Sequence, residues 1–474
     1  MLFNSLQFFI FFPLVTLIYF FLPQKFKWLH LLIASCIFYC AFIPIYIFIL
    51  FFTIIIDYFA GILLENSKGK KRKIYLIASL VSNIGVLAFF KYYNFFVENI
   101  NSFFHQTHLS DHSLSVLAII LPIGLSFHTF QAMSYTIEVY RGNQKAERHF
   151  GYYSLYVMFY PQLVAGPIER PQQLLYQLHA NHRADPAEIG SGLRLMAWGY
   201  FKKMVVADHL AIYVDKVFAN PGRFSGFPAA TAVVFFSFQI YCDFSGYTDI
   251  ARGASRVMGI NLMRNFNFPY FSTSIKEFWT RWHRSLSTWF RDYLYFPLGG
   301  NKKGISRWCF NIGIVFLLSG LWHGANWTFI IWGALHGFYM ISGYLAKRWV
   351  PVSAIRISRI LKMIGVFALV SFGWIFFRSK DLHAAVDMIR SCLIGYHLFH
   401  PGLTTNIVSS MFFYICVLSV LFLIAVEALA FSRNFFQQFL RWDSRYKMAC
   451  YVMLCLSIVC LGVFNHTRFI YFQF

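Results

Sequence analysis

Long apolar runs follow one another along almost the whole chain, separated by short polar stretches. Runs of this length are typical of helices that cross a bilayer, because a helix rises about 1.5 Å per residue and the hydrocarbon layer is about 30 Å thick. Several runs are too short, too long or too polar for a simple crossing, and there we expect tilted or re-entrant helices packed inside protein. The expected spans are residues 7–22, 29–43, 45–65, 74–94, 114–139, 151–165, 192–213, 229–260, 309–346, 358–377, 406–429 and 445–464.

Composition excludes an ordinary soluble domain. Of the 474 residues, 58% are hydrophobic and 13% are charged, and phenylalanine alone occurs 58 times. The chain has no internal repeat and no extended polar segment, so we predict one all-α polytopic membrane domain over residues 1–474. The nine cysteines lie mostly inside apolar runs and form no CxxC pair, so we expect small buried hydrophobic side chains and neither disulfides nor a metal site.

The net charge of +22 predicts topology rather than nucleic-acid binding, because lysine and arginine collect in the short cytoplasmic loops of membrane proteins. The basic segment Lys68–Lys73 and the Lys25/Lys27 turn two spans earlier are expected in the cytoplasm, which leaves the amino terminus outside. Residues 101–112 contain no lysine or arginine and fit an external loop, and residues 141–148 return to the cytoplasm. We expect the first apolar run to be a retained span, since it lacks a basic leader and a small-residue cleavage site.

The nine residues Ser319–Trp327 place His323 in the middle of a glycine-broken apolar stretch. An ionisable group at membrane depth is costly and marks a functional site by default; the alternative is a core histidine bonded to a helix carbonyl. Apolar surroundings disfavour the imidazolium ion, so we expect a neutral ring that can accept a proton at pH 7, as a general base does. If Lys302 and Lys303 are cytoplasmic, a helix from Trp308 reaches His323 after about 22 Å, deep in the hydrocarbon layer.

A second informative stretch runs from Asn265 to Tyr293. Ser274 and Glu277 have the spacing of a capping box, so a helix is expected to begin there. The pattern predicts one amphipathic interfacial helix with His283 on its buried side; a snorkelling anchor with an incidental histidine is the alternative. The expected buried face comprises Trp279, Trp282, His283, Leu286, Trp289, Phe290 and Tyr293.

Other polar residues in the apolar runs are weaker candidates. Asn326 lies three residues after His323, where its amide could orient the ring or polarise an acyl carbonyl, or cap the helix break. Asp243, Tyr247 and Asp249 flank Gly246 inside an expected span and could line a cavity or pair with arginines. On a continuous helix, His336 would point away from His323, so we expect a structural role for it.

Three motifs, in order along the chain, resemble the membrane-bound O-acyltransferase superfamily: Tyr241–Ile250, Glu277–His283 and Leu321–Trp327. Two more, Val164–Pro171 and Phe469–Phe474, resemble its bacterial branch that O-acetylates cell-envelope polysaccharides such as alginate. Each motif is modest evidence, but their order and combination are specific, and the resemblance covers essentially the whole chain.

The resemblance implies a ring of tilted helices around a thin centre, where a cytoplasmic cavity for an acyl donor meets an outer funnel. It implies that His323 is the catalytic histidine and His283 its polar partner, with Trp322 beside them. It also implies a multi-pass protein of the cell inner membrane.

The activity implied is transfer of an acetyl group from a cytoplasmic thioester, acetyl-CoA, whose phosphates would meet Arg281, Arg284 or Arg291. Because the chain carries no nucleophilic-serine motif, we expect a separate periplasmic or surface acetyltransferase as partner. Alginate, cellulose and peptidoglycan all remain open as final acceptor. The alternatives are a D-alanyl or lipid acyltransferase of the same superfamily and a secondary transporter, which would commonly show a repeated pair of broken helices.

Overall fold

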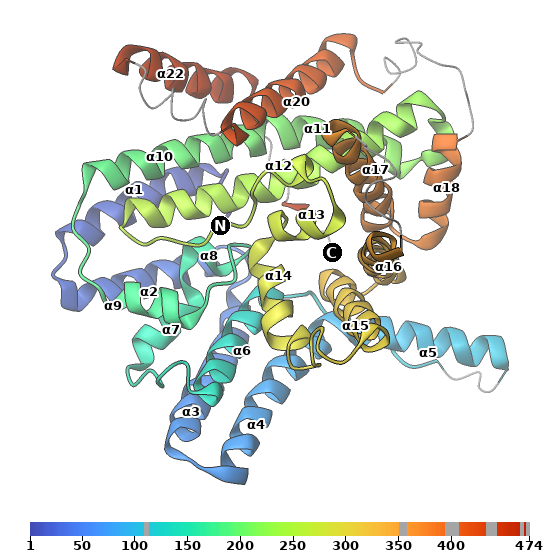
Figure 1. Cartoon of the computed structure of the whole chain (residues 1–474). Coiled ribbons are helices and arrows are strands. Elements are labelled where there is room, and N and C mark those ends of the chain that lie inside the picture. The colour runs from blue at the N-terminus through green and yellow to red at the C-terminus, as the bar shows by residue number, and fades with distance from the viewer. Residues whose placement is uncertain (109–112, 350–357, 394–406, 433–442, 465–468, 471–474) are drawn as a thin grey trace. The chain divides into compact units, whose positions relative to one another are not determined.

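The computed structural model describes residues 1–108, 113–349, 358–393, 407–432, 443–464 and 469–470. Over these residues the secondary structure is helical and contains no strand, as predicted (Figure 1). In the described part of the chain, eight helices are long and apolar enough to cross a membrane, which confirms a polytopic membrane protein. The chain forms two compact units, residues 1–196 with 251–263 and residues 197–250 with 264–474. Each is described by itself, and the single domain over residues 1–474 stays a prediction.

In the first unit, α1, α3 and α7 begin within two residues of the start of an expected apolar run, whereas α2 and α4 begin five residues earlier than expected. Helices α3, α4 and α6 pack against one another. Asp57 on α3 accepts hydrogen bonds from Ser79 (2.6 Å) and Asn83 (2.8 Å) on α4, so the two helices are joined by a buried polar group. Its elements are α1 (Leu6–Phe21), α2 (Gln24–Cys40), η1 (Pro44–Tyr46), α3 (Ile47–Asn66), α4 (Gly69–Leu87), η2 (Ala88–Tyr92), α5 (Tyr93–Thr107), α6 (Leu125–Arg141), α7 (Phe150–Met158), α8 (Tyr160–Leu163), α9 (Pro171–His179) and most of α10 (Pro186–Tyr200).

The span expected over residues 114–139 is only partly helical. Helix α6 begins at Leu125, because Pro122 and the left-handed Gly124 (φ 79°) precede it. A side chain at Gly124 would lie 2.8 Å from a backbone carbonyl oxygen, so the turn requires glycine. The external loop expected over residues 101–112 is also partly wrong, since α5 continues to Thr107; residues 109–112 lie outside the described residues.

The second unit contains all the histidines and arginines assigned to the site by sequence. It comprises the end of α10, η3 (Phe201–Ala207), α11 (Asp208–Ala219), η4 (Pro221–Arg223), α12 (Phe227–Val257) up to Ile250, η5 (Pro269–Phe271), α13 (Ile275–Arg281), α14 (Arg284–Phe290), η6 (Arg291–Tyr295), α15 (Ile305–His323), α16 (Trp327–Trp349), α17 (Arg359–Arg378), α18 (Leu382–Leu393), α20 (Ser410–Phe431) and α22 (Ser444–Leu461). Of these, η3 and η6 are π-helical.

The run expected over residues 309–346 is a helical hairpin rather than one helix. It breaks at residues 324–326, and α15 and α16 then pack side by side along their length. The rings of Trp308 and Tyr344, near the start of α15 and the end of α16, lie 4.4 Å apart, so the two helices are antiparallel. His323 is therefore the last residue of a helix at the hairpin turn, not a residue in the middle of a continuous helix.

Glycines allow the hairpin helices to approach closely. A β-carbon at Gly320 on α15 would lie 2.2 Å from the carbonyl oxygen of Phe329 on α16. A β-carbon at Gly333 on α16 would likewise lie 2.3 Å from the carbonyl oxygen of Phe316 on α15. Both distances are far below van der Waals contact, so these positions hold the backbones together at the end of the hairpin that carries His323.

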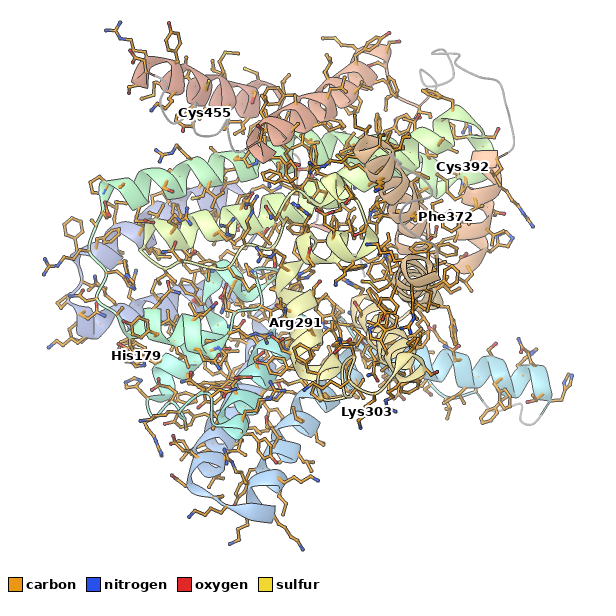
Figure 2. The ribbon with its side chains drawn as sticks, in the orientation of Figure 1. His179, Arg291, Lys303, Phe372, Cys392 and Cys455 are labelled. Carbon is orange, nitrogen blue, oxygen red and sulfur yellow. The ribbon has the colours of Figure 1, made fainter. Side chains whose placement is uncertain are left out.

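The prediction that all nine cysteines are buried is wrong for three of them. Cys450, Cys455 and Cys460 lie exposed on α22 (Figure 2 labels Cys455), and α22 buries none of its described residues within the chain. An apolar helix that faces lipid keeps its hydrophobic side chains outside the protein core, so apolar composition does not imply burial by protein in a membrane.

Candidate active site

The helix expected to carry His283 is interrupted at that residue. Helix α13 ends at Arg281, His283 has left-handed backbone angles (φ 41°, ψ 56°), and α14 begins at Arg284. A left-handed conformation is costly for a residue with a side chain, so it persists only where the surroundings fix it. Here the backbone N–H of Arg284 donates to the Asn265 carbonyl (2.9 Å) and that of Ser285 to the Asn265 side chain (3.1 Å).

The expected helix start at Ser274 is confirmed, with the Glu277 side chain bonded one residue before the N-cap rather than to it. The Ser274 hydroxyl accepts from the backbone N–H of Glu277 (3.2 Å), and the Glu277 carboxylate accepts from the backbone N–H of Thr273 (2.8 Å). The same carboxylate forms an ion pair with Arg281 (2.9 Å), which also donates to the Asn267 carbonyl (3.0 Å). Arg281 is therefore part of the local structure that ends α13.

Both candidate histidines are buried against the same indole ring. The Trp322 ring centroid lies 4.9 Å from that of His323 and 6.2 Å from that of His283. His323 is 4% exposed and also packs on Trp332 (5.0 Å) and Phe377 (5.3 Å). The structure therefore brings together the two histidines and the tryptophan that the sequence singled out.

His283 is fully buried, and its ring meets Phe244 edge-on at 4.7 Å. The Ser285 hydroxyl lies 3.5 Å from Nδ1 of His283. Burial lowers the pKa of His283 to about 3, so the ring is neutral at pH 7. A neutral imidazole has one nitrogen that donates a hydrogen bond and one that accepts, which suits it to hold a hydroxyl group.

His336 cannot be oriented by counting turns from His323, because the helix is broken between them. Its ring is fully buried and packs on Trp332 (4.9 Å) and Trp279 (5.0 Å). The Trp332 ring also contacts His323, so both histidines pack on this indole, and the structural role of His336 stays a prediction.

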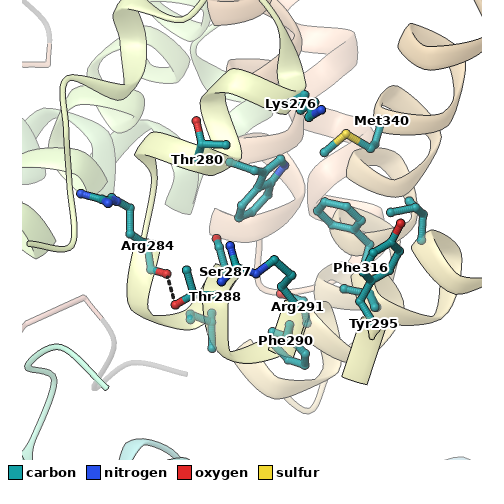
Figure 3. Close-up of a pocket in the computed structure, with 15 residues that line it drawn as sticks. Lys276, Thr280, Arg284, Ser287, Thr288, Phe290, Arg291, Tyr295, Phe316 and Met340 are labelled. Atoms are coloured by element: carbon teal, nitrogen blue, oxygen red, sulfur yellow. Dashed lines mark hydrogen bonds between the residues drawn. The ribbon is translucent and has the colours of Figure 1, made fainter. Parts of the chain in front are cut away.

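A cavity of about 350 Å³ lies beside α13, α14 and α15. Arg284 and Arg291, two of the three arginines proposed for donor phosphates, line it, and Arg281 is not among its lining residues. In Figure 3 the Arg291 side chain extends toward Ser287, whereas the Arg284 side chain extends away from Phe316 and Met340, at the edge of the cavity.

The cavity connects basic residues with the neighbourhood of His323. Lys276 also lines it, and none of the lining residues is acidic, although the lining residue Arg291 forms an ion pair with Asp292 (2.8 Å). Ser319 lines the cavity one helical turn before His323, on the same face of α15. A second cavity of about 1000 Å³, lined by Lys347 and Arg348 among others, shares lining residues with the first, Lys276 included. An anionic ligand with an apolar part is the chemistry that suits these walls.

Of the two roles left open for Asn326, the structure shows the helix cap. Its side-chain oxygen accepts from the backbone N–H of Thr328 (3.0 Å), and its amide nitrogen donates to the Lys380 carbonyl (2.9 Å). The amide thus stabilises the start of α16 and the hairpin turn.

Asp243 pairs with a lysine rather than with an arginine. Its carboxylate lies 2.7 Å from Nζ of Lys203, which also binds Asp208 (2.8 Å). The other oxygen of Asp243 accepts from the backbone N–H of Ile470 (2.7 Å). Tyr247 is buried one turn further on α12, with its ring 4.8 Å from that of Phe469.

The sequence analysis missed Lys202, Lys203 and Glu427, whose side chains are buried near these residues. Lys202 forms an ion pair with Asp249 (2.6 Å), and Glu427 accepts from the Tyr241 hydroxyl (2.6 Å). The available signal was the adjacent pair Lys202 and Lys203 in the middle of an expected span, where basic residues need partners.

Comparisons with known proteins agree with the motifs. A sequence model of the membrane-bound O-acyltransferase family matches residues 144–380. A protein of Pseudomonas aeruginosa named "Probable alginate O-acetylase AlgI" is 38% identical over 402 residues, covering 82% of this chain and 74% of the relative. A peptidoglycan O-acetyltransferase of Helicobacter pylori is 34% identical over 423 residues (82% and 79%), and a teichoic acid D-alanyltransferase of Bacillus subtilis is 30% identical over 288 residues (55% and 69%).

Proposed function

The chain belongs to the membrane-bound O-acyltransferase family, and we propose that its reaction is the transfer of an acetyl group from acetyl-CoA toward O-acetylation of a cell-envelope polysaccharide. The family makes it a multi-pass membrane acyltransferase. The acetyl group and the polysaccharide are supported by the names of its alginate and peptidoglycan O-acetylating relatives, which match over 82% of this chain.

One observation carries the catalytic assignment: His323 and His283 are buried on the same indole, and Ser319, one helical turn before His323, lines a cavity that Lys276, Arg284 and Arg291 also line. In the proposed reaction, the oxygen of an acceptor hydroxyl attacks the thioester carbonyl, and His323 accepts the proton of that hydroxyl. The new C–O bond forms as the C–S bond breaks, and the proton passes to the leaving thiolate to give free CoA. His283 holds the acceptor hydroxyl or stabilises the charge that develops on the carbonyl oxygen.

The donor is proposed to enter from the cytoplasm, since the basic turn that contains Lys302 and Lys303 precedes α15 (Figure 2 labels Lys303). The same positive-inside argument places the amino terminus outside the cytoplasm. The membrane is proposed to be the inner membrane of the cell. A separate periplasmic or surface acetyltransferase would then carry the acetyl group to the polymer. The absence of a nucleophilic-serine motif in this sequence supports that division of labour.

The basic cavity can be tested as the donor site. A charge-assisted hydrogen bond to phosphate contributes about 1.5–3 kcal/mol, so Arg284→Gln with Arg291→Gln should raise the KM for acetyl-CoA at least about 10-fold. Because both arginines are remote from the reacting bond, kcat should change little. The matched control is Arg307→Gln, which removes an exposed arginine that lines neither cavity. Equal KM values for the double variant and the control would contradict the donor site.

The catalytic proposal is tested with purified protein, acetyl-CoA and a hydroxyl acceptor, by following release of free CoA. His323→Ala should lose about 10²- to 10⁴-fold in turnover while acetyl-CoA binding persists, because a base acts on the chemical step. The matched control is His383→Ala, since that side chain is 85% exposed on α18 of the same unit. Turnover that survives His323→Ala at equal protein amount would refute the assignment. Consumption of a D-alanyl thioester in place of acetyl-CoA would refute the acetyl donor.

A further inference from the structure

Two residues near the end of the sequence, Phe469 and Ile470 (the chain end), are buried in the second unit, although the proposed reaction gives them no task. Phe469 and Ile470 are 1% and 2% exposed. They belong to the terminal motif that marks the polysaccharide-acetylating branch in the sequence. Polar and aromatic contacts anchor these two residues, and both sets of contacts lie on the part of α12 that faces the candidate site.

The polar anchor is a buried group of three charges. Lys203 lies between Asp208 (2.8 Å) and Asp243 (2.7 Å), and all three side chains are buried. The Asp243 oxygen that Lys203 does not bind accepts the backbone N–H of Ile470 at 2.7 Å. A buried carboxylate needs its hydrogen bonds to offset desolvation, so the chain end is part of what stabilises this group.

The aromatic contacts connect Phe469 with His283 through one side chain, that of Phe244. The Phe469 ring lies 5.8 Å from that of Phe244, and the Phe244 ring meets that of His283 edge-on at 4.7 Å. Phe469 also packs on Tyr247 at 4.8 Å, which fixes its ring from a second side. Removing Phe469 would open a space beside Phe244, the side chain that contacts His283.

We propose that the chain end is a positioning element of the active site: Asp243 fixes the backbone at Ile470, and Phe469 holds Phe244 against His283. The proposal rests on the proposed function for the role of His283. It assigns no contact with substrate to Phe469. Its effect on the reaction is through the place and the rigidity of the His283 ring.

A packing measurement tests this without any reaction. In a chain whose nine cysteines are replaced by alanine, His283→Cys places a thiol at the buried position. Adding Phe469→Ala should raise the rate of its labelling by a small thiol reagent about 10-fold or more, because the local structure opens more often. Phe464→Ala, the same substitution at a 56% exposed position near the same end, should leave the rate within about twofold. Equal labelling in the two variants would overturn the proposal.

Turnover then tests the positioning role. In the chain with its native His283, Phe469→Ala should lower kcat about 10- to 100-fold with the KM for acetyl-CoA unchanged, as expected when a reacting geometry shifts by about 1 Å. Phe469→Leu, which keeps most of the apolar volume, should recover much of that loss. If Phe469→Ala fails to reach the membrane, Phe469→Val, which removes the ring and more volume than leucine does, takes its place, and a kcat for Phe469→Val equal to that of Phe464→Ala would overturn the proposal.

Two variants separate the two interactions of Asp243, the hydrogen bond from the Ile470 N–H and the ion pair with Lys203. Both Asp243→Asn and Asp243→Ala leave Lys203 with one carboxylate, but only asparagine keeps an oxygen that can accept the Ile470 N–H. Asp243→Asn should therefore lose less kcat than Asp243→Ala, and equal losses would contradict the anchor. A wild-type protein that releases no CoA would refute the proposed function instead, and the labelling rates would still decide the packing claim.

Discussion

The close approach of α15 and α16 makes Gly320→Ala a sharp test of how the hairpin places His323. The added β-carbon would lie 2.2 Å from the Phe329 carbonyl oxygen. Carbon and oxygen atoms in close contact lie about 3.3 Å apart, so the helices must separate by about 1 Å at this point. Neither atom belongs to a flexible side chain, so the clash cannot be relieved by a rotamer change.

Gly320→Ala should affect the stability of the fold less than it affects turnover. Overpacking of this kind costs about 1–3 kcal/mol, which a membrane protein of this size can tolerate. Gly320 is three residues from His323 and on the neighbouring turn, so the histidine moves with the separated backbone. A shift of about 1 Å in a reacting group can reduce turnover about 100-fold, so catalysis should suffer far more than folding.

The assay compares CoA release and thermal stability for Gly320→Ala and Gly313→Ala. Gly313 lies two turns earlier on α15, and a β-carbon there has no heavy atom within 4 Å, so this control adds the same methyl group without a clash. We expect Gly313→Ala to match the wild type in both measurements. If Gly320→Ala also turned over within about twofold of the wild type at equal abundance, the hairpin contact would not set the position of His323.

Three further predictions concern other parts of the chain. Burial raises the pKa of Glu169 to about 7, so the carboxyl is protonated in the fold at low pH and ionises at a cost as the pH rises from about 4.5 through about 7. Thermal stability should fall less over that range in Glu169→Gln than in the wild type; parallel profiles would contradict the assignment. Asn326→Ala should lower stability by about 1 kcal/mol through the lost cap, measured by thermal denaturation, and no loss would contradict the cap. Single cysteines at residues 68–73 and 302–303 should resist an impermeant thiol reagent applied to intact cells, and ready labelling would reverse the topology.

The sequence predicts the helices of this protein better than their interruptions. Apolar runs identify α3 and α17 almost to their ends, because a span needs about 20 apolar residues whatever it contacts. The break at His283 was not predicted, because it depends on bonds from Asn265 to the backbone after the histidine, and a helical periodicity contains no trace of them.

The candidate site shows the same division. His323 and His283 could be selected from local pattern and motif resemblance, since a histidine in an apolar run is conspicuous on its own. The bond between Asp243 and Ile470 joins residues 227 positions apart, and its existence depends on tertiary packing that no local pattern encodes. The adjacent lysines at 202 and 203 indicated buried partners, but only the structure identifies them.

The most direct test of the central claim is a sided transfer measurement. The protein is reconstituted in liposomes with labelled acetyl-CoA on the side of Lys302 and Lys303 and a hydroxyl acceptor on the other side. The account predicts label on the acceptor, free CoA retained with the donor, and loss of both in His323→Ala but not in His383→Ala. Free acetate or intact acetyl-CoA on the acceptor side, independent of His323, would contradict it and indicate a transporter.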